Sequence, residues 1–180
     1  MKKLFTILVF TTASLLSWQA HAELKAGDAA PDFTLTDQNN QAVTLSELKG
    51  KWIVLYFYPK NNTPGCTTEA CSFRDNINKL IEQQATILGI SIDTVESHQE
   101  FAKKHRLPFQ LLADPGAIAA ARYDAMLNLG IVRLAKRHSF IINPEGIITH
   151  TYRSVDPDTH VLDVLNDLKK AQSSWKSDHS

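Results

Sequence analysis

The sequence predicts an α/β protein in which helices are layered on a sheet. Three observations lead to this prediction. The length of 180 residues fits one globular domain. Strand-like and helix-like apolar patterns alternate along the chain, which favours a layered α/β fold. Residues 53–58 form an unbroken run of β-branched, leucine and aromatic side chains, which is typical of a buried central strand.

An N-terminal hairpin and a long helix flank this central strand in the sequence. Residues 33–35 and 42–45 lie on either side of the turn-like segment 37–40, and this pattern predicts the hairpin. Pro59 ends the central strand. Residues 64–84 then predict one long helix, because apolar side chains recur there at helical spacing, namely Phe73, Ile77, Leu80 and Ile81.

The second half of the chain continues the alternation of strands and helices. The predicted elements are a strand at 86–92, a helix at 95–105, a strand at 109–112, a helix from about 117 to 126, a hairpin of strands 139–142 and 147–153, and a closing helix at 158–171. The polar residues 172–180 predict a frayed end. No repeat, linker or second domain is visible in the sequence.

The first 22 residues have the pattern of an export signal. A basic start at Met1–Lys3 precedes the apolar stretch Leu4–Trp18 and a small-x-small pattern that ends at Ala22. The stretch is short for a membrane span, although a membrane anchor is the alternative. We expect cleavage near Ala22 and a periplasmic or otherwise exported protein. The mature chain would contain a domain at 23–172 and a polar C-terminal tail at 173–180.

The charge balance argues against nucleic acid as a partner. The chain has 19 basic and 19 acidic residues. Removal of Lys2 and Lys3 with the signal leaves 17 basic residues (19 − 2) against 19 acidic ones. No aromatic-rich basic stripe is present, and the remaining lysines and arginines are dispersed as on an ordinary solvated surface.

The two cysteines of the chain, Cys66 and Cys71, are the main functional signal. Thr63 has the character of an N-cap and Pro64 fits the first helical position, so Cys66 falls in the first helical turn. The unpaired N–H groups and the helix dipole at that end favour the thiolate, which is the nucleophilic form of cysteine. Cys66 is therefore the predicted nucleophile.

The spacing of Cys66 and Cys71 constrains a bond between them. On an ideal helix, residues five apart are separated by roughly 7.5 Å of rise, which puts their Cα atoms at about 8–9 Å. An unstrained disulfide spans at most about 7 Å between Cα atoms. A bond would therefore require the first helical turns to unwind, which favours a working redox couple. A static disulfide and inert or metal-binding thiols are the alternatives.

The sequence gives no pattern for a metal site, and we expect no cofactor. Zinc takes four ligands, and neither cysteine has a histidine pair at finger-like spacing. No HExxH pattern is present. We expect surface or helix-cap positions for the scattered histidines His98, His105, His138, His150 and His160.

The segment Phe57–Cys71 resembles the active-site segment of peroxiredoxins, specifically the bacterioferritin comigratory protein or peroxiredoxin Q group. The family pattern of Pro, three residues, Thr or Ser, two residues and Cys matches Pro59, Thr63 and Cys66. The resemblance extends over nearly all of the mature chain, through the segments 30–35, 91–98, 107–114 and 137–146. It implies a thioredoxin-like fold with an N-terminal β-hairpin extension.

The resemblance also implies a role for each matching residue. Cys66 would be the peroxidatic cysteine, which becomes a sulfenic acid. Thr63 would hold the thiolate and the substrate, although a plain N-cap explains it equally well. Pro59 would shield the sulfur from water, and as a strand terminator it would look the same. Arg137 would stabilise the thiolate and the departing oxygen. Glu69 could hold Arg137 in place or simply lie on a solvated helix face.

An atypical two-cysteine mechanism follows from the same resemblance. Cys71 would be the resolving cysteine, which attacks the sulfenic acid and forms an intramolecular disulfide. A thioredoxin-like dithiol would then reduce this disulfide, and in an oxidising periplasm that reductant must be a dedicated one. No partner subunit is needed, so we expect a monomer, with no stable membrane association after signal removal.

Two further features bear on function. The segment between Tyr123 and Arg137 is shorter than in many relatives and is apolar enough to pack or to form a contact surface, and we favour packing. Three functions fit the residues: a thiol peroxidase, a thiol–disulfide oxidoreductase for exported proteins, and a redox sensor without turnover. Thr63 with Arg137 favours the peroxidase, because disulfide exchange needs no arginine to stabilise an oxygen.

Overall fold

The computed structural model describes residues 23–130 and 132–179, so the predicted signal segment 1–22 lies outside the described residues. The strands are β1 (Thr34–Asp37), β2 (Ala42–Thr44), β3 (Trp52–Phe57), β4 (Ala85–Ser91), β5 (Gln110–Ala113), β6 (Met126–Leu129), β7 (Val132–Ala135), β8 (Ser139–Ile142) and β9 (Ile148–Tyr152). The helices are the 3₁₀ turn η1 (Leu45–Leu48), α1 (Pro64–Asp75), α2 (Ile77–Glu82), α3 (Val95–His105), α4 (Ile118–Arg122) and α5 (His160–Asp178).

A seven-stranded sheet forms the centre of the molecule, in the order β2-β1-β5-β4-β3-β8-β9. Strands β3, β4 and β5 are parallel, and β8 pairs antiparallel with β3. The expected N-terminal hairpin is present as β1 and β2, and β1 joins it to the sheet by pairing with β5. The second expected hairpin is present as β8 and β9. The layered α/β architecture predicted from the sequence is therefore confirmed.

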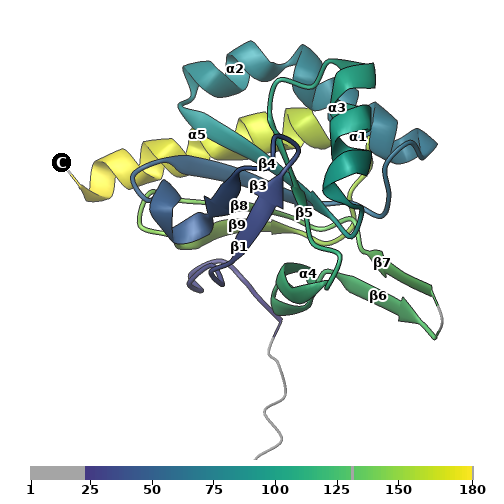
Figure 1. Ribbon diagram of the computed structural model, residues 1–180. Coiled ribbons are helices and arrows are strands. Elements are labelled where there is room, and N and C mark those ends of the chain that lie inside the picture. Colours follow the sequence, from purple (N-terminus) through teal and green to yellow (C-terminus); the bar gives the residue numbers. More distant parts are fainter. Residues whose placement is uncertain (1–22, 131, 180) are drawn as a thin grey trace, which may run out of the picture.

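Both faces of β3 are buried, which explains its unbroken apolar sequence. Alternate side chains of a strand point to opposite faces of the sheet. Val54 and Tyr56 enter a core shared with α1, α2, α3 and α5, whereas Ile53, Leu55 and Phe57 enter a second core shared with α4 and the N-terminal hairpin. Figure 1 shows the same arrangement, with α1, α2, α3 and α5 over one face and α4 under the other.

The long helix predicted over residues 64–84 is wrong in one respect, because it is broken at Asn76. Asn76 ends α1 and precedes α2, with φ −106° and ψ 12°, and its side-chain amide donates to the Ser72 carbonyl at 3.0 Å. A short polar side chain that bonds to the backbone in this way competes with helix continuation. Ile81, which helical spacing predicted inside, lies on α2 after the break and is 61% exposed.

The closing helix is longer than predicted. Helix α5 continues through Asp178, so the expectation of a frayed end from residue 172 is wrong. The ring of Trp175 packs edge-on against Trp52 with centroids 6.3 Å apart, and this contact attaches the last turns to the core. The polar residues from 172 onward thus lie mainly on the exposed face of α5.

The segment between Tyr123 and Arg137 also differs from the prediction. Helix α4 ends at Arg122, and the chain then forms the hairpin β6–β7, which extends from the body in Figure 1. Ala135 is buried and Met126 packs against the second core, while Leu127 is 38% exposed. Packing therefore accounts for the base of this hairpin, and Ile131 lies outside the described residues.

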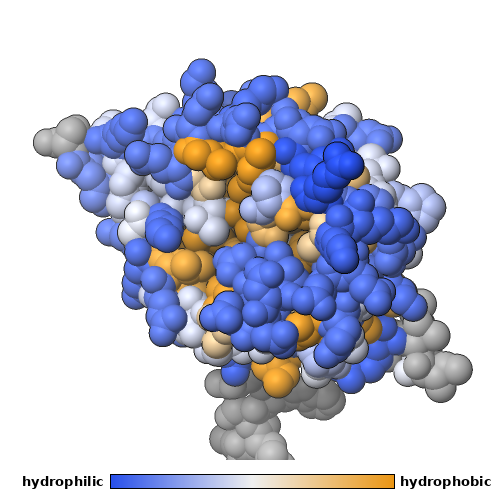
Figure 2. All heavy atoms as spheres, turned by 45° about the horizontal axis from the view of Figure 1, so that its top comes forward, coloured by the Kyte–Doolittle hydropathy of each residue, from blue (hydrophilic) through white to orange (hydrophobic). Residues whose placement is uncertain are grey.

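The surface is polar over most of the helical face. Figure 2 shows hydrophilic side chains across this face with apolar atoms in patches between them. Over residues 23–130 and 132–179, no helix combines the length and the apolar composition that crossing a membrane requires.

Candidate active site

The sequence positions Cys66 in the first turn of α1, as predicted. Strand β3 ends at Phe57, and the chain crosses residues 58–63 before α1 begins at Pro64. Thr63 occupies the N-cap with extended backbone angles (φ −81°, ψ 149°). Cys66 is 1% exposed, so its thiol lies in the interior near the positive end of the α1 dipole.

Arg137 contacts Cys66, although the two residues are 71 positions apart. Its Nη2 donates to the Cys66 Sγ at 3.5 Å, while its Nη1 donates to the Glu69 carboxylate. The sheet brings them together, because Ser139 in β8 pairs with Tyr56 in β3. Of the sequence-predicted site residues, Cys66, Glu69 and Arg137 therefore form one connected group.

The electrostatics of this group keep the guanidinium charged. Burial alone would lower the pKa of Arg137, but the Glu69 carboxylate and the Cys66 thiol raise it above its ordinary value. Gly65 gives the guanidinium room: a Cβ at this position would lie 3.2 Å from Arg137 Nη2 and 3.4 Å from Pro157 Cγ. A side chain at position 65 would therefore press against the guanidinium.

A fourth member of the group, His160, was missed by the sequence reasoning. Its Nδ1 lies 2.8 Å from the Glu69 Oε1, and neither side chain is more than 1% exposed. Glu69 is therefore a buried carboxylate between an imidazole and a guanidinium, and the solvated-face alternative for Glu69 is wrong. The spacing of His160 with Val164 and Leu168 places it on the apolar face of α5, and this spacing could have revealed it.

Buried side chains also fix the segment between β3 and α1. The Tyr58 hydroxyl donates to the Asn61 Oδ1 at 2.8 Å and lies 3.2 Å from the His98 Nδ1. The Asn61 N–H donates to Asp93 at 2.8 Å, and the His98 Nε2 lies 3.2 Å from the Leu112 carbonyl oxygen. This network attaches the approach to Cys66 to α3 and β5.

The surface positions expected for the histidines are wrong in three cases. His98, His138 and His160 are buried, with exposed fractions of 0%, 6% and 2%. Each of them has a polar partner in the interior. A polar partner for at least one ring nitrogen is what lets each imidazole be buried, although the Nε2 of His160 has no partner among the described residues.

Thr63 and Pro59 lie close to the start of α1 in the chain. The Thr63 hydroxyl donates to the Lys60 carbonyl oxygen at 3.0 Å and makes no capping bond to α1. Its backbone carbonyl accepts from the Thr67 N–H at 2.9 Å, so Thr63 caps by position only. Pro59 is half-buried directly after Tyr58.

Cys71 lies on the same unbroken helix as Cys66, and the two thiols are free. Cys71 is half-buried, whereas Cys66 is buried. An intact α1 separates the two sulfurs by more than one helical turn, in agreement with the spacing argument from the sequence.

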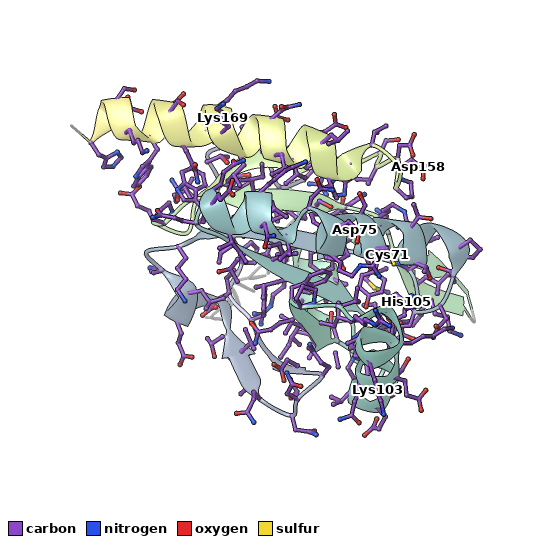
Figure 3. All side chains as sticks on the ribbon, turned by 90° about the horizontal axis from the view of Figure 1, so that it is seen from above. Cys71, Asp75, Lys103, His105, Asp158 and Lys169 are labelled. Carbon is purple, nitrogen blue, oxygen red and sulfur yellow. The ribbon has the colours of Figure 1, made fainter. Side chains whose placement is uncertain are left out.

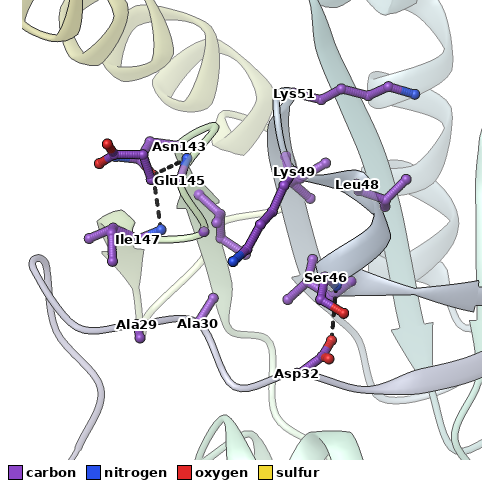
Figure 4. A pocket seen from close by; sticks show the side chains of 14 residues that line it. Ala29, Ala30, Asp32, Ser46, Leu48, Lys49, Lys51, Asn143, Glu145 and Ile147 are labelled. Carbon is purple, nitrogen blue, oxygen red and sulfur yellow. Dashed lines mark hydrogen bonds between the residues drawn. The ribbon is translucent and has the colours of Figure 1, made fainter. Parts of the chain in front are cut away.

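Outside the group around Cys66, the remaining candidates are metal sites and cavities. Within the described ranges, no group of three or more His, Cys, Asp or Glu side chains is arranged to hold a metal. A cavity of about 310 Å³ lies at the opposite end of β3, where Ile53 lines it together with the turns that carry Lys49 and Glu145 (Figure 4). This cavity is separate from Cys66, which follows the other end of the strand.

The fold and the site together define a class of protein. A buried thiol in the first turn of a helix, bonded to a charged guanidinium on an α/β scaffold, is the arrangement that a thiol-based oxidoreductase requires of its nucleophile.

Comparison with known proteins identifies the family. The AhpC/TSA family model matches residues 26–151. Peroxiredoxin Bcp of Bacillus subtilis is 43% identical over 150 residues, which cover 81% of this chain and 96% of the relative. Putative peroxiredoxin bcp of Coxiella burnetii is 40% identical over 151 residues, 81% of this chain and 99% of the relative.

Solved structures give the same result. Peroxidoxin BcpB from Mycobacterium tuberculosis superposes with a TM-score of 0.78 at 34% identity, covering 82% of this chain and 98% of that one. PrxQ of Xylella fastidiosa superposes with a TM-score of 0.79 at 33% identity, covering 84% of this chain and 99% of that one. The chain belongs to the Bcp/PrxQ peroxiredoxins of the AhpC/TSA family and is a peroxidase with the thioredoxin-like fold.

Proposed function

We propose that this protein reduces hydrogen peroxide and small organic hydroperoxides by an intramolecular two-cysteine cycle and serves in antioxidant defence. Cys66 is the peroxidatic cysteine and Cys71 the resolving cysteine. The observation that carries the proposal is the 3.5 Å hydrogen bond from Arg137 Nη2 to the Cys66 Sγ, in a site where Glu69 holds the other end of the guanidinium.

In the first step the Cys66 thiolate attacks one peroxide oxygen. An S–O bond forms, the O–O bond breaks, and the departing oxygen leaves as an alcohol or water after taking a proton. The sulfur is oxidised to the sulfenic acid and the peroxide is reduced. Arg137 is charged and stabilises both the thiolate before the attack and the negative oxygen that departs.

Thr63 and Pro59 assist this step. The Thr63 hydroxyl donates to Lys60, so its oxygen remains free to accept a hydrogen bond from the O–H of the hydroperoxide. Pro59, which is half-buried and has no N–H, would shield the thiolate from water, as the family pattern implies. Glu69 acts through Arg137 as a positioning residue.

In the second step α1 unwinds locally and the Cys71 thiolate attacks the Cys66 sulfur. The S–S bond forms, the S–O bond breaks, and the departing hydroxide takes up the proton that the Cys71 thiol lost and leaves as water. An external thioredoxin-like dithiol then reduces the disulfide. Two free thiols on an intact helix support this proposal, because the reduced enzyme is the state ready for peroxide.

The proposed location is the periplasm or another exported compartment, after cleavage near Ala22. The basic start, apolar stretch and small-x-small pattern of residues 1–22 support it. The full chain, expressed in a bacterium, should appear in the fraction released by osmotic shock, with an N-terminus at Glu23 by mass. A cytoplasmic protein that retains Met1 would contradict the location and leave the peroxidase proposal standing.

The activity is tested by peroxide consumption with excess dithiol. The mature wild-type protein is compared with Cys66→Ser and Cys71→Ser, which make the same atomic change on one helix. Cys66→Ser should lose turnover completely, whereas Cys71→Ser should accumulate a sulfenic acid that dimedone traps on Cys66. A wild-type rate equal to that of dithiol alone, or an active Cys66→Ser variant, would overturn the proposal.

A further inference from the structure

Cys71 has an imidazole neighbour of its own. The His105 Nδ1 lies 3.9 Å from the Cys71 Sγ, across the contact between α1 and α3. Figure 3 shows the two side chains next to each other between these helices. The other ring nitrogen of His105, Nε2, is buried and has no hydrogen-bond partner among the described residues. The Cys71 thiol is therefore the one hydrogen-bonding partner of the His105 ring among the described residues.

Arg74 completes the surroundings of Cys71. Its Nη1 donates to the His105 carbonyl oxygen at 2.8 Å, and its Nε donates to Asp75 at 2.8 Å. The pKa of Arg74 is raised, mainly by the hydrogen bond to Asp75 and further by the Cys71 thiol. The positive charge of Arg74 thus lies beside both the Cys71 thiol and His105.

The protonation state of His105 suits a base. Burial, and then the charges of Lys104 and Arg74, lower the pKa of His105 below its ordinary value. The imidazole is therefore neutral at pH 7 and able to accept a proton. His105 is also the last residue of α3, where the negative end of the helix dipole stabilises the imidazolium that forms.

We propose that His105 is the base that activates the resolving cysteine, and that Arg74 stabilises the resulting thiolate. The proposal rests on the two-cysteine function proposed above. It gives the two thiols separate partners. Cys66 contacts Arg137, which is held through Glu69 by His160 of α5. Cys71 is served by His105 of α3 and by Arg74 of its own helix.

The step balances as follows. The Cys71 thiol gives its proton to His105 Nδ1 and becomes a thiolate, which attacks the sulfur of the Cys66 sulfenic acid. The S–S bond forms and the S–O bond breaks, so the sulfenic sulfur is reduced and the Cys71 sulfur is oxidised. The hydroxide takes up the proton that His105 accepted, and water leaves.

The experiment separates the two steps of the cycle. Wild-type protein and His105→Gln are each mixed with one equivalent of peroxide and quenched at set times between pH 5.5 and pH 9. Mass spectrometry then counts the Cys66 sulfenic acid and the disulfide. In His105→Gln we expect sulfenic acid to form at the wild-type rate and the disulfide to form about 10-fold to 100-fold more slowly at pH 7. The difference should vanish near pH 9, where a thiol ionises unaided.

A second variant and a control complete the design. The charged groups that face the Cys71–His105 pair are Arg74 and Asp75 from α1 and Lys104 from α3. Lys104→Gln removes a charge that lowers the pKa of His105, so it should move the pH midpoint of disulfide formation upward. His150→Gln, on β9, is the matched histidine control and should match the wild type.

The outcomes distinguish this inference from the proposed function. If sulfenic acid forms but His105→Gln keeps the wild-type rate and pH midpoint of disulfide formation, the role of His105 is overturned and the peroxidase stands. The same holds if the rate falls equally at every pH, since that is a packing effect. If Cys66 forms no sulfenic acid in any variant, the proposed function fails and this inference falls with it.

Discussion

The His160 imidazole lies 2.8 Å from the Glu69 carboxylate, and both side chains are buried between α1 and α5. The second carboxylate oxygen of Glu69 accepts from Arg137, which in turn contacts Cys66. His160, at the start of α5, is therefore connected to the Cys66 thiol through two intervening side chains. The geometry around Cys66 depends on three segments that are distant in sequence.

Glu69→Gln should slow the oxidation of Cys66 by about 10-fold or more at pH 7, because the amide cannot hold the guanidinium as a carboxylate does. Stopped-flow measurement of the oxidation step with hydrogen peroxide checks this. Glu96→Gln, which changes an exposed glutamate on α3, is the control and should leave the rate unchanged. Equal rates for both variants would show that Glu69 does not position Arg137.

His160→Asn should destabilise the protein by about 3 kcal/mol, because it leaves a buried carboxylate with one partner fewer. Urea denaturation at pH 7 measures this loss. His150→Asn, at a half-buried position of β9, should cost about 1 kcal/mol or less. If the two variants had the same midpoint, the contact between His160 and Glu69 would contribute nothing to stability.

Gly89→Ala should cost about 2 kcal/mol of stability through overpacking. A Cβ on Gly89 would lie 2.7 Å from the ring of Tyr56 and 2.9 Å from the Leu111 Cδ2, which are its neighbours on the two adjacent strands. Gly116→Ala is the control, because its Cβ would meet only the Ile118 side chain, at 3.4 Å. Thermal or urea unfolding of both variants checks the difference, and equal losses would refute the steric argument.

His138 should make the fold sensitive to mild acid. Burial, then the charge of Arg153, lower its pKa from 6.5 to about 4, and an Arg153 N–H donates to its Nδ1 at 2.9 Å. The unfolded chain therefore takes up this proton near pH 6.5 and the folded chain only near pH 4. The free energy of unfolding should fall as the pH decreases through this window, by about 3 kcal/mol at its lower end.

Urea denaturation of the wild type and His138→Asn across pH 4 to 7 isolates this effect. The comparison is needed because burial also lowers the pKa of His98, which acts in the same direction. The variant should show a shallower pH dependence than the wild type. Parallel curves would mean that His138 titrates alike in the folded and unfolded chains.

The local part of the site could be predicted from the sequence, because Thr63, Pro64 and Cys66 carry their own helix signals. The contact between Arg137 and Cys66 came from the family resemblance, since no local pattern joins residues 71 positions apart. The contact between Glu69 and His160 spans 91 positions and depends on how α5 packs on α1, which neither pattern nor resemblance supplied.

The histidines illustrate why side-chain environments were harder to predict than elements. His98 and His105 share helical spacing with Phe101 on α3, a pattern that is easily overlooked because the histidines are dispersed along the chain. A polar residue on an apolar face is a signal for a buried hydrogen bond or a function. The break at Asn76 could not be predicted for a different reason. The apolar periodicity continues through residue 76, whereas the helix ends there because the Asn76 side chain donates to the Ser72 carbonyl oxygen.

The hairpin β6–β7 stands directly before Arg137, yet it does not determine where that residue lies. The Lys136 N–H donates to the Ala125 carbonyl oxygen at 2.7 Å and closes the base of the hairpin, and the pairing of β8 with β3 fixes the chain that follows. The chain that carries Arg137 is therefore held by backbone bonds on both sides, at the base of the hairpin and in the sheet. We expect a substitution on the exposed part of the hairpin, such as Leu127, to change a surface of the protein while the contact between Arg137 and Cys66 stays in place.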